Sequence, residues 1–118
     1  MHELPITKNI LDLVCLYAHR AKAQKVVTIV LELGVLRDLK KEWLERYFRY
    51  ISRGTIASEA DILVTEVPLT CKCLTCQNIF SVDLDRLTNE SILCPDCQAR
   101  QYEIITGMEF KIQGIEVV

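Results

Sequence analysis

Two short cysteine pairs, Cys73/Cys76 and Cys94/Cys97, constrain the fold of this chain more than any other feature. Each pair encloses two residues, a spacing that lets one tight turn direct both sulfurs at a common point. Two such turns facing each other supply the tetrahedron of thiolates that a structural zinc ion prefers. A site made only of protein sulfurs has no position for water or substrate. The pairs therefore predict a zinc site that holds structure and does no chemistry.

Disulfide bonds are the alternative use of these cysteines. Residues 1–9 lack a basic stretch followed by an apolar run and a cleavage site, so we expect no secretory signal. In the reducing cytoplasm this spacing favours zinc over disulfides. Cys71 lies two residues before Cys73 and offers the metal a competing register, but only Cys73 forms the two-residue spacing. Cys15 lies in an apolar helical stretch, where we expect a small buried hydrophobic residue.

Size and charge narrow the function classes. The chain has 118 residues, enough for one domain or for a small domain with a metal-stapled module. Its formal net charge is −2 and its pI is about 5.7, which argues against nucleic acid as the main partner because phosphate binding needs a clustered basic face. No apolar run reaches the roughly 18 residues that span a bilayer. We expect a cytoplasmic protein that binds neither nucleic acid nor membrane.

Hydrophobic periodicity predicts two helices and two strands before the cysteines. Apolar residues at three- and four-residue steps predict a helix from Pro5 to about Gln24, with Ile6, Ile10, Val14, Tyr17 and Ala21 on its buried face. A β-branched run over 26–33, ended by Gly34, predicts a strand. Residues 41–53 predict a second helix that buries Leu44, Phe48 and Ile51, and residues 61–67 a second strand.

The cysteine-rich segment divides the predicted domain. Large aliphatic residues thin out over 70–101, so we expect metal, and not a core, to hold this segment. The pattern becomes strand-like again over 108–118, with a bulge at Gly114, and this strand should return to the first sheet. The predicted fold class is α+β: a small mixed β-sheet packed with two helices, plus an inserted zinc-ribbon-like module. The predicted domains are 1–69 with 106–118, and 70–105.

The first three residues, Met1-His2-Glu3, form a second candidate metal site. A free α-amine, the His2 amide and the His2 imidazole can hold one metal in fused chelate rings, and the Glu3 amide or carboxylate can complete the set. Nitrogen ligation in a plane suits Ni(II) or Cu(II) better than Zn(II). We expect such a site at a chain end to be mobile, as a carrier that must release its metal requires.

The order of these motifs resembles the hydrogenase nickel-incorporation proteins of the HypA/HybF family. The resemblance covers the whole chain: an opening Met-His-Glu, an amphipathic helix, a strand, a helix ending near Gly54-Thr55, two cysteine pairs and a terminal strand. It implies a nickel metallochaperone for [NiFe] hydrogenase maturation, and in some organisms for urease. It implies nickel on His2 with Met1 and Glu3, and structural zinc on Cys73, Cys76, Cys94 and Cys97. The implied partners are an accessory GTPase and the hydrogenase large subunit.

The chain departs from the family pattern after its first predicted strand. The family usually shows Gly-x-Leu-Ser-Gly-Val, whereas this chain has Gly34-Val35-Leu36-Arg37-Asp38. A charged pair thus replaces a small, flexible turn. Cys71 is an additional thiol beside the cysteine pair. Neither departure changes a metal ligand, but each affects a position where partner contacts or thiol exchange can occur.

Three functions remain from different classes. The first is a nickel carrier, and the alternative is a zinc-ribbon protein-interaction or regulatory module without nickel transfer. An enzyme is the third, and we expect none because the sequence has no open zinc motif, nucleophile elbow or phosphate-binding glycine loop. We expect a monomer or a weak, domain-swapped dimer. His19 is expected to be a solvated helix residue, and the charges of Lys40–Arg49 fit a solvent-exposed helix face or a partner-docking surface.

Overall fold

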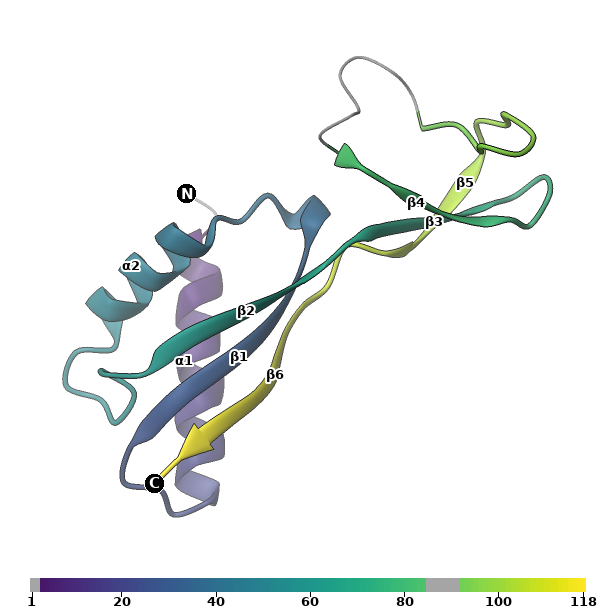
Figure 1. Cartoon of the computed structure of the whole chain (residues 1–118). Coiled ribbons are helices and arrows are strands. Elements are labelled where there is room, and N and C mark those ends of the chain that lie inside the picture. The colour runs from purple at the N-terminus through teal and green to yellow at the C-terminus, as the bar shows by residue number, and fades with distance from the viewer. Residues whose placement is uncertain (1–2, 85–91) are drawn as a thin grey trace. The chain divides into compact units, whose positions relative to one another are not determined.

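The computed structural model describes residues 3–84 and 92–118 (Figure 1). It contains two α-helices, a short 3₁₀ turn and six strands over these residues. In chain order they are α1 (Glu3–Arg20), β1 (Val26–Gly34), η1 (Val35–Arg37), α2 (Lys41–Ile51), β2 (Asp61–Val67), β3 (Leu69–Cys73), β4 (Ile79–Val82), β5 (Tyr102–Thr106) and β6 (Phe110–Val117).

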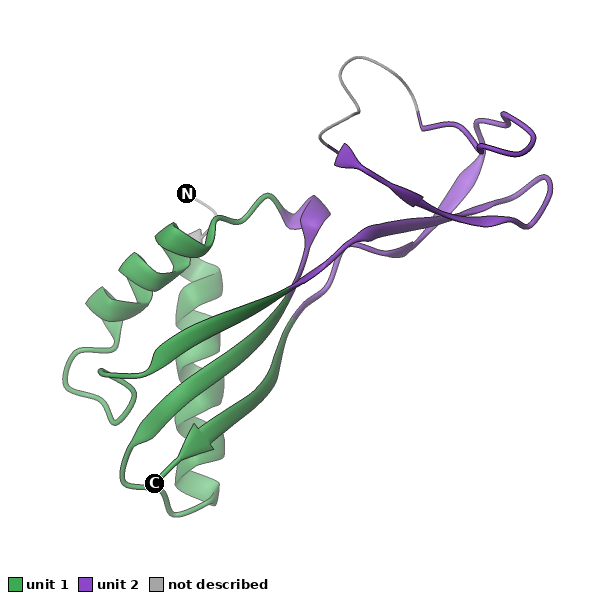
Figure 2. Cartoon of the chain, viewed as in Figure 1, with its two compact units in different colours: residues 1–32, 38–65, 111–118 green, residues 33–37, 66–110 purple. Residues whose placement is uncertain are grey.

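The chain divides into two compact units (Figure 2). Unit 1 comprises residues 1–32, 38–65 and 111–118, and unit 2 comprises residues 33–37 and 66–110. Unit 2 is therefore built from an internal segment together with a short stretch that follows β1. The division predicted from the sequence, a nickel-binding domain of residues 1–69 with 106–118 and a zinc-binding domain of residues 70–105, stays a prediction.

A three-stranded sheet with the order β2-β1-β6 forms the framework of unit 1. Strands β1 and β2 run in the same direction (Figure 1), as expected for two strands joined through a helix. Strand β6 runs against β1: the N–H of Val118 donates to the carbonyl of Lys25 at 2.9 Å, and that of Gly34 to Glu109 at 2.7 Å at the other end. The predicted mixed sheet with a returning terminal strand is confirmed.

Both helices bury one apolar stripe. On α1 the buried residues include Ile10, Val14 and Ala18, and on α2 they are Leu44 and Phe48. The periodicity places these residues three or four positions apart, on one face of each helix. Among the described residues, no helix combines the length and the apolar character needed to cross a lipid bilayer.

The predicted inner face of the first helix is wrong at two residues. Tyr17 is 42% exposed, so it lies at the margin of the stripe and not in its centre. Ala21 is exposed because α1 ends at Arg20, before the predicted end of the helix. Cys15 is half-buried, not fully buried as expected.

Unit 2 contains a second three-stranded sheet with the order β4-β3-β5. The central strand β3 is antiparallel to both neighbours, with Cys71 opposite Phe80 on β4 and opposite Ile104 on β5. Alternate residues of β3 are buried and form a small core, whose members are Leu69, Cys71, Cys73, Phe80 and Cys94. The expectation that metal alone holds this segment is therefore wrong: three strands and a core also contribute.

Two glycines of unit 2 allow the backbone to make a close contact. A Cβ atom added to Gly34 would lie 2.1 Å from the carbonyl oxygen of Gly107, closer than real side chains approach backbone. Gly107 itself has a φ of 121°, a conformation in which L side chains are strained. Next to Gly34, the N–H of Leu36 donates to the carbonyl of Gly107 at 2.9 Å. The strand end and the 107–108 segment are thus joined backbone to backbone.

Arg37 and Asp38, the charged pair that replaces the small turn of the family pattern, fit the backbone of this segment. The Nε atom of Arg37 donates to the carbonyl of Met108 at 2.7 Å. Asp38 has a φ of 49°, in the left-handed region where aspartate is among the tolerated side chains. The position that is glycine in the family pattern thus keeps a glycine-like backbone in this chain.

We predict that Gly34→Ala destabilises the fold by about 1–3 kcal/mol, because the added methyl group meets backbone that cannot rotate away. Thermal and urea unfolding followed by circular dichroism measure the change. Gly114→Ala is the matched control, since a Cβ there meets no atom within 4 Å. Equal stability of the two variants would contradict the importance of the Gly34–Gly107 contact.

Candidate metal centre

The first cysteine pair lies on a tight turn after β3. The N–H of Gln77 donates to the carbonyl of Cys73 at 3.0 Å, and the N–H of Cys73 donates to the carbonyl of Asn78 at 2.8 Å. Gln77 has a φ of 68°, which reverses the chain so that it can enter β4. The N–H groups of Thr75 and Cys76 point at the Cys73 sulfur, at 3.4 and 3.5 Å. The turn therefore orients backbone donors toward a thiolate.

The second pair repeats this turn with the same hydrogen bonds. The N–H of Gln98 donates to the carbonyl of Cys94 at 2.8 Å, and the N–H of Cys94 to the carbonyl of Ala99 at 3.1 Å. Gln98 has a φ of 60°, matching its counterpart in the first turn. In both turns the first cysteine is buried and the second is exposed. Two equivalent turns thus supply one inner and one outer sulfur each.

The four sulfurs converge on one point within unit 2. The Cys73 and Cys97 sulfurs are 3.5 Å apart, the Cys76 and Cys94 sulfurs are 3.6 Å apart, and all four lie within 4.8 Å of one another. A Zn–S bond of about 2.3 Å in a tetrahedron separates neighbouring sulfurs by about 3.8 Å. The observed separations therefore fit four thiolates around one zinc ion.

Hydrogen bonding separates the inner from the outer thiols. The N–H groups of Cys76 and Thr75 lower the pKa of Cys73 to about 6. The N–H of Cys97, followed by that of Asp96, likewise lowers the pKa of Cys94.

The outer thiols have raised pKa values and so hold their protons more tightly than the inner ones. The N–H of Asn78 lowers the pKa of Cys76, but burial and hydrogen bonds with the other three sulfurs outweigh it and raise that pKa to about 12. The N–H of Ala99 lowers the pKa of Cys97, but the hydrogen bond with Cys73 and burial outweigh it, so that this pKa is also raised. Since a metal binds thiolates, its binding must displace these remaining protons.

The remaining cysteines lie outside this cluster. Cys71 is fully buried in the core of unit 2, and burial raises the pKa of its thiol. It is not among the residues whose ligand atoms converge, so the register based on Cys73 is the one that the fold uses. Burial and, secondarily, Asp12 raise the pKa of the half-buried Cys15 thiol. Over residues 3–84 and 92–118, which include every cysteine, no disulfide forms.

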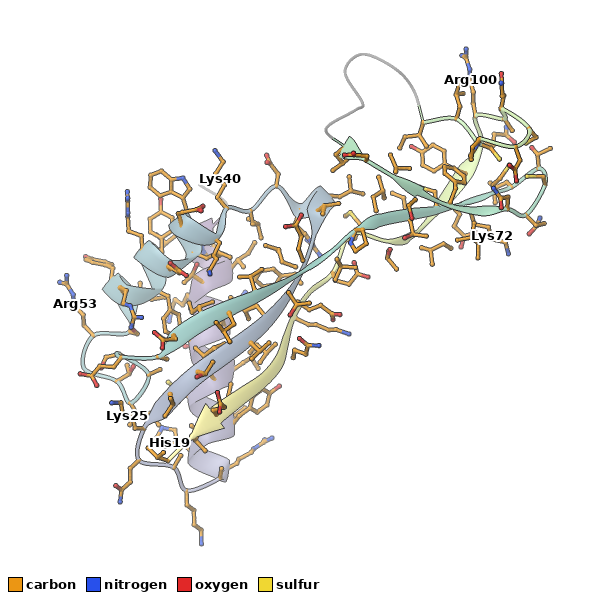
Figure 3. The ribbon with its side chains drawn as sticks, in the orientation of Figure 1. His19, Lys25, Lys40, Arg53, Lys72 and Arg100 are labelled. Atoms are coloured by element: carbon orange, nitrogen blue, oxygen red, sulfur yellow. The ribbon has the colours of Figure 1, made fainter. Side chains whose placement is uncertain are left out.

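The proposed nickel ligands Met1 and His2 lie outside the described residues, and the structure describes Glu3 only as the first residue of α1. The second histidine, His19, is exposed near the end of α1, as predicted (Figure 3). Of the residues that the sequence suggests as ligands, the structure therefore brings together the four cysteines.

Sequence reasoning missed the backbone that builds the two turns. The carbonyls of Asn78 and Ala99 and the left-handed glutamines fix the sulfur positions as firmly as the cysteine spacing does. The sequence does contain a signal for these turns. Each pair reads Cys-x-x-Cys-Gln, and the repeated glutamine marks the equivalent position in the two turns.

Comparison with known proteins gives a match over nearly the whole chain. The model of the family described as hydrogenase/urease nickel incorporation, metallochaperone, HypA matches residues 1–117. Hydrogenase maturation factor HypA of Dehalococcoides mccartyi is 33% identical over 117 residues, covering 99% of this chain and 94% of that protein. The protein of the same name from Picosynechococcus is 29% identical over 118 residues and covers all of both chains.

Two solved structures have the same fold. The solution structure of the Ni metallochaperone HypA from Helicobacter pylori superposes with a TM-score of 0.68, at 18% identity, over 100% of this chain and 98% of that one. A second solution structure of a HypA protein gives a TM-score of 0.74, also at 18% identity, over 100% and 97% of the two chains.

We predict that Cys94→Ala removes bound zinc and unfolds unit 2, because three sulfurs cannot close the tetrahedron and structural zinc contributes about 10–16 kcal/mol in isolated peptides. Metal analysis by mass spectrometry and amide NMR spectra of unit 2 measure both effects. Cys71→Ala is the matched control: it removes a buried thiol from the same core and should retain one zinc per chain. Zinc loss in the Cys71 variant would contradict the assigned ligands.

Proposed function

Because the chain belongs to the HypA family, we propose that it is a nickel metallochaperone that binds Ni(II) and delivers it for the maturation of [NiFe] hydrogenase. The single observation that carries the proposal is the family match over residues 1–117, which includes both the opening residues and the cysteine cluster. The family description also includes urease, so urease is a second candidate recipient of the nickel.

The four-cysteine centre has the structural role in this proposal. Cys73, Cys76, Cys94 and Cys97 hold one Zn(II), which fixes the two turns relative to each other. Their convergence within 4.8 Å and the hydrogen-bond donors aimed at the inner sulfurs support this assignment. With four protein ligands the ion has no open position for a substrate. The zinc centre thus organises unit 2 and does not transfer metal.

Nickel binds, in this proposal, to the opening residues of the chain. His2 supplies its imidazole and amide nitrogens, Met1 its α-amine, and Glu3 a further donor. A nitrogen-rich planar set suits Ni(II), which distinguishes this site from the sulfur-only site. The two sites therefore select different metals through their ligand chemistry, one for retention and one for transfer.

A nickel carrier needs partner proteins that act with it and receive its nickel. An accessory GTPase of hydrogenase maturation acts with the chain, and the hydrogenase large subunit receives the nickel, in the cytoplasm. The chain is not itself an enzyme, since its role ends with delivery of the ion. Its two domains, 1–69 with 106–118 and 70–105, separate the nickel-binding end from the zinc module in the same proposal.

We predict that His2→Ala weakens Ni(II) binding by more than the roughly 10–100-fold typical of lost outer-shell partners, because it removes a direct ligand. Isothermal titration of zinc-loaded protein that begins at Met1 measures the affinity. His19→Ala is the matched control, since His19 is an exposed histidine on α1.

The same titration on protein extended by a few residues before Met1 tests the α-amine. Extension converts the amine into an amide and should abolish the site. Unchanged Ni(II) affinity in both the extended protein and the His2 variant would leave the zinc-ribbon interaction module as the better function.

We predict that Ni(II) affinity falls steeply as the pH is lowered from about 8 to 6. The α-amine and imidazole have reference pKa values of about 7.7–8.0 and 6.5, and each binds metal only after losing its proton. Protons therefore compete with nickel increasingly as the pH falls through these values. Competition titrations with a coloured nickel chelator across this range measure the change, and a flat profile would contradict an amine–imidazole site.

A further inference from the structure

Helix α2 carries two arginine–aromatic pairs on its exposed side. The guanidinium of Arg46 lies 4.7 Å from the centre of the Trp43 ring, and that of Arg53, just past the helix end, lies 5.3 Å from the Tyr50 ring. Trp43 also stacks on Tyr47, with ring centres 5.9 Å apart. We call Trp43, Arg46, Tyr50 and Arg53 the arginine–aromatic face.

The two pairs repeat with a regular spacing. Trp43 and Tyr50 are seven residues apart within α2, which corresponds to two helical turns or about 10.5 Å along the helix. The aromatic rings are exposed, Trp43 by 40% and Tyr50 by 65%. Figure 3 shows Arg53 projecting outward beyond the end of α2. The face therefore presents two positive charges, each beside an exposed ring.

Among residues 3–84 and 92–118, the ion pairs involve neither arginine of this face. Nearby cations are neutralised: Lys41 pairs with Glu45 at 3.5 Å, and Arg49 pairs with Asp61 at 3.7 Å and donates to the carbonyl of Ser58 at 3.0 Å. Over the residues that the structure describes, Arg46 and Arg53 form neither an ion pair nor a hydrogen bond to a carboxylate. Their charges are held in place by aromatic rings but are not neutralised.

A groove runs beside this face. Arg46 and Arg53 line it together with Arg49, Tyr50 and residues of β2, among them Ile62 and Leu63. Leu63 is 51% exposed, so the groove offers apolar contact as well as charge. Tryptophan, tyrosine and arginine are the residues that dominate binding energy at protein interfaces. The composition of the groove and its rim is therefore that of a protein-binding surface.

We propose that the arginine–aromatic face binds an acidic segment of a protein partner, with one carboxylate on Arg46, a second on Arg53, and apolar side chains against Trp43 and Tyr50. Three residues of an extended peptide span about 10 Å, so two acidic residues three positions apart match the spacing of the two rings beside which the arginines lie. The guanidinium fork suits carboxylates, which it binds through two parallel hydrogen bonds.

Separate carboxylates fit this surface better than a continuous polyanion does. Glu42, Glu45 and Asp61 also line the groove and would repel the unbroken phosphate chain of a nucleic acid. A peptide can place neutral residues opposite these acidic groups and charged residues opposite the arginines. The proposal concerns unit 1 alone and does not depend on nickel binding at the opening residues.

The test is binding of a fluorescein-labelled extended peptide with two glutamates three positions apart and leucine between them, followed by fluorescence anisotropy. We expect the zinc-loaded full chain to bind it in about 50 mM NaCl and to release it as the salt is raised to about 300 mM. The variant Arg46→Gln/Arg53→Gln should bind about tenfold more weakly, a loss typical of removed charge pairs.

The matched control is Arg20→Gln/Arg100→Gln, which changes the net charge by the same amount at exposed residues that belong neither to α2 nor to the groove. Retained peptide affinity in this control supports a local site. An equal loss of affinity in the two double variants overturns the proposal, because the binding would then reflect general charge attraction. Binding of a glutamine version of the peptide as tight as that of the acidic one also overturns the proposal. So does tighter binding of a single-stranded oligonucleotide, or the absence of peptide binding by the unaltered chain. Unchanged melting temperatures confirm that each variant is folded.

Discussion

Pairing of β6 with β1 is the constraint on which the two-unit arrangement depends. β1 is the central strand of its sheet, and its second neighbour comes from the end of the chain, after all of the metal-binding segment. Joining distant chain segments costs entropy that rises with the length of loose chain between them. Sulfur ligation between Cys73 and Cys97, together with the sheet of unit 2, shortens that loose chain. A zinc ion held by these sulfurs would therefore favour the first sheet through chain connectivity.

The strands and helices of unit 1 could be predicted because their apolar residues form β-branched runs or recur at three- and four-residue steps. The β-branched run over 26–33 fits only a strand, and the apolar spacing of α2 fits only a helix. The strands of unit 2 could not be predicted in this way. On β3, Cys71 and Cys73 occupy the buried positions of an alternating strand, and cysteines considered only as metal ligands hide that pattern. Burial in this small module depends on residues that also have a chemical role.

The cysteine cluster was predictable for a geometric reason, and its details were not. Two residues between cysteines limit the distance between their sulfurs, so convergence follows from spacing. The exact turn depends on Gln77 and Gln98 adopting a left-handed conformation, which propensity disfavours for glutamine. Hydrogen bonds to the cysteine carbonyls stabilise that conformation. The local cost is therefore offset by contacts that form only once the turn is closed, and the repeated glutamine marks the position without showing these contacts.

Arginines in this chain have two different roles, and the atoms they contact separate these roles. Arg37 donates to the Met108 carbonyl, and Arg49 is held by Asp61 and the Ser58 carbonyl, so both are committed to internal contacts. Arg46 and Arg53 rest on aromatic rings, which orient a guanidinium while leaving its N–H groups able to bind a carboxylate. Fixing a side chain before binding reduces the entropy lost when a partner arrives. An arginine stacked on a ring is for this reason better prepared for recognition than a freely rotating one, and the arginine–aromatic face has two of them.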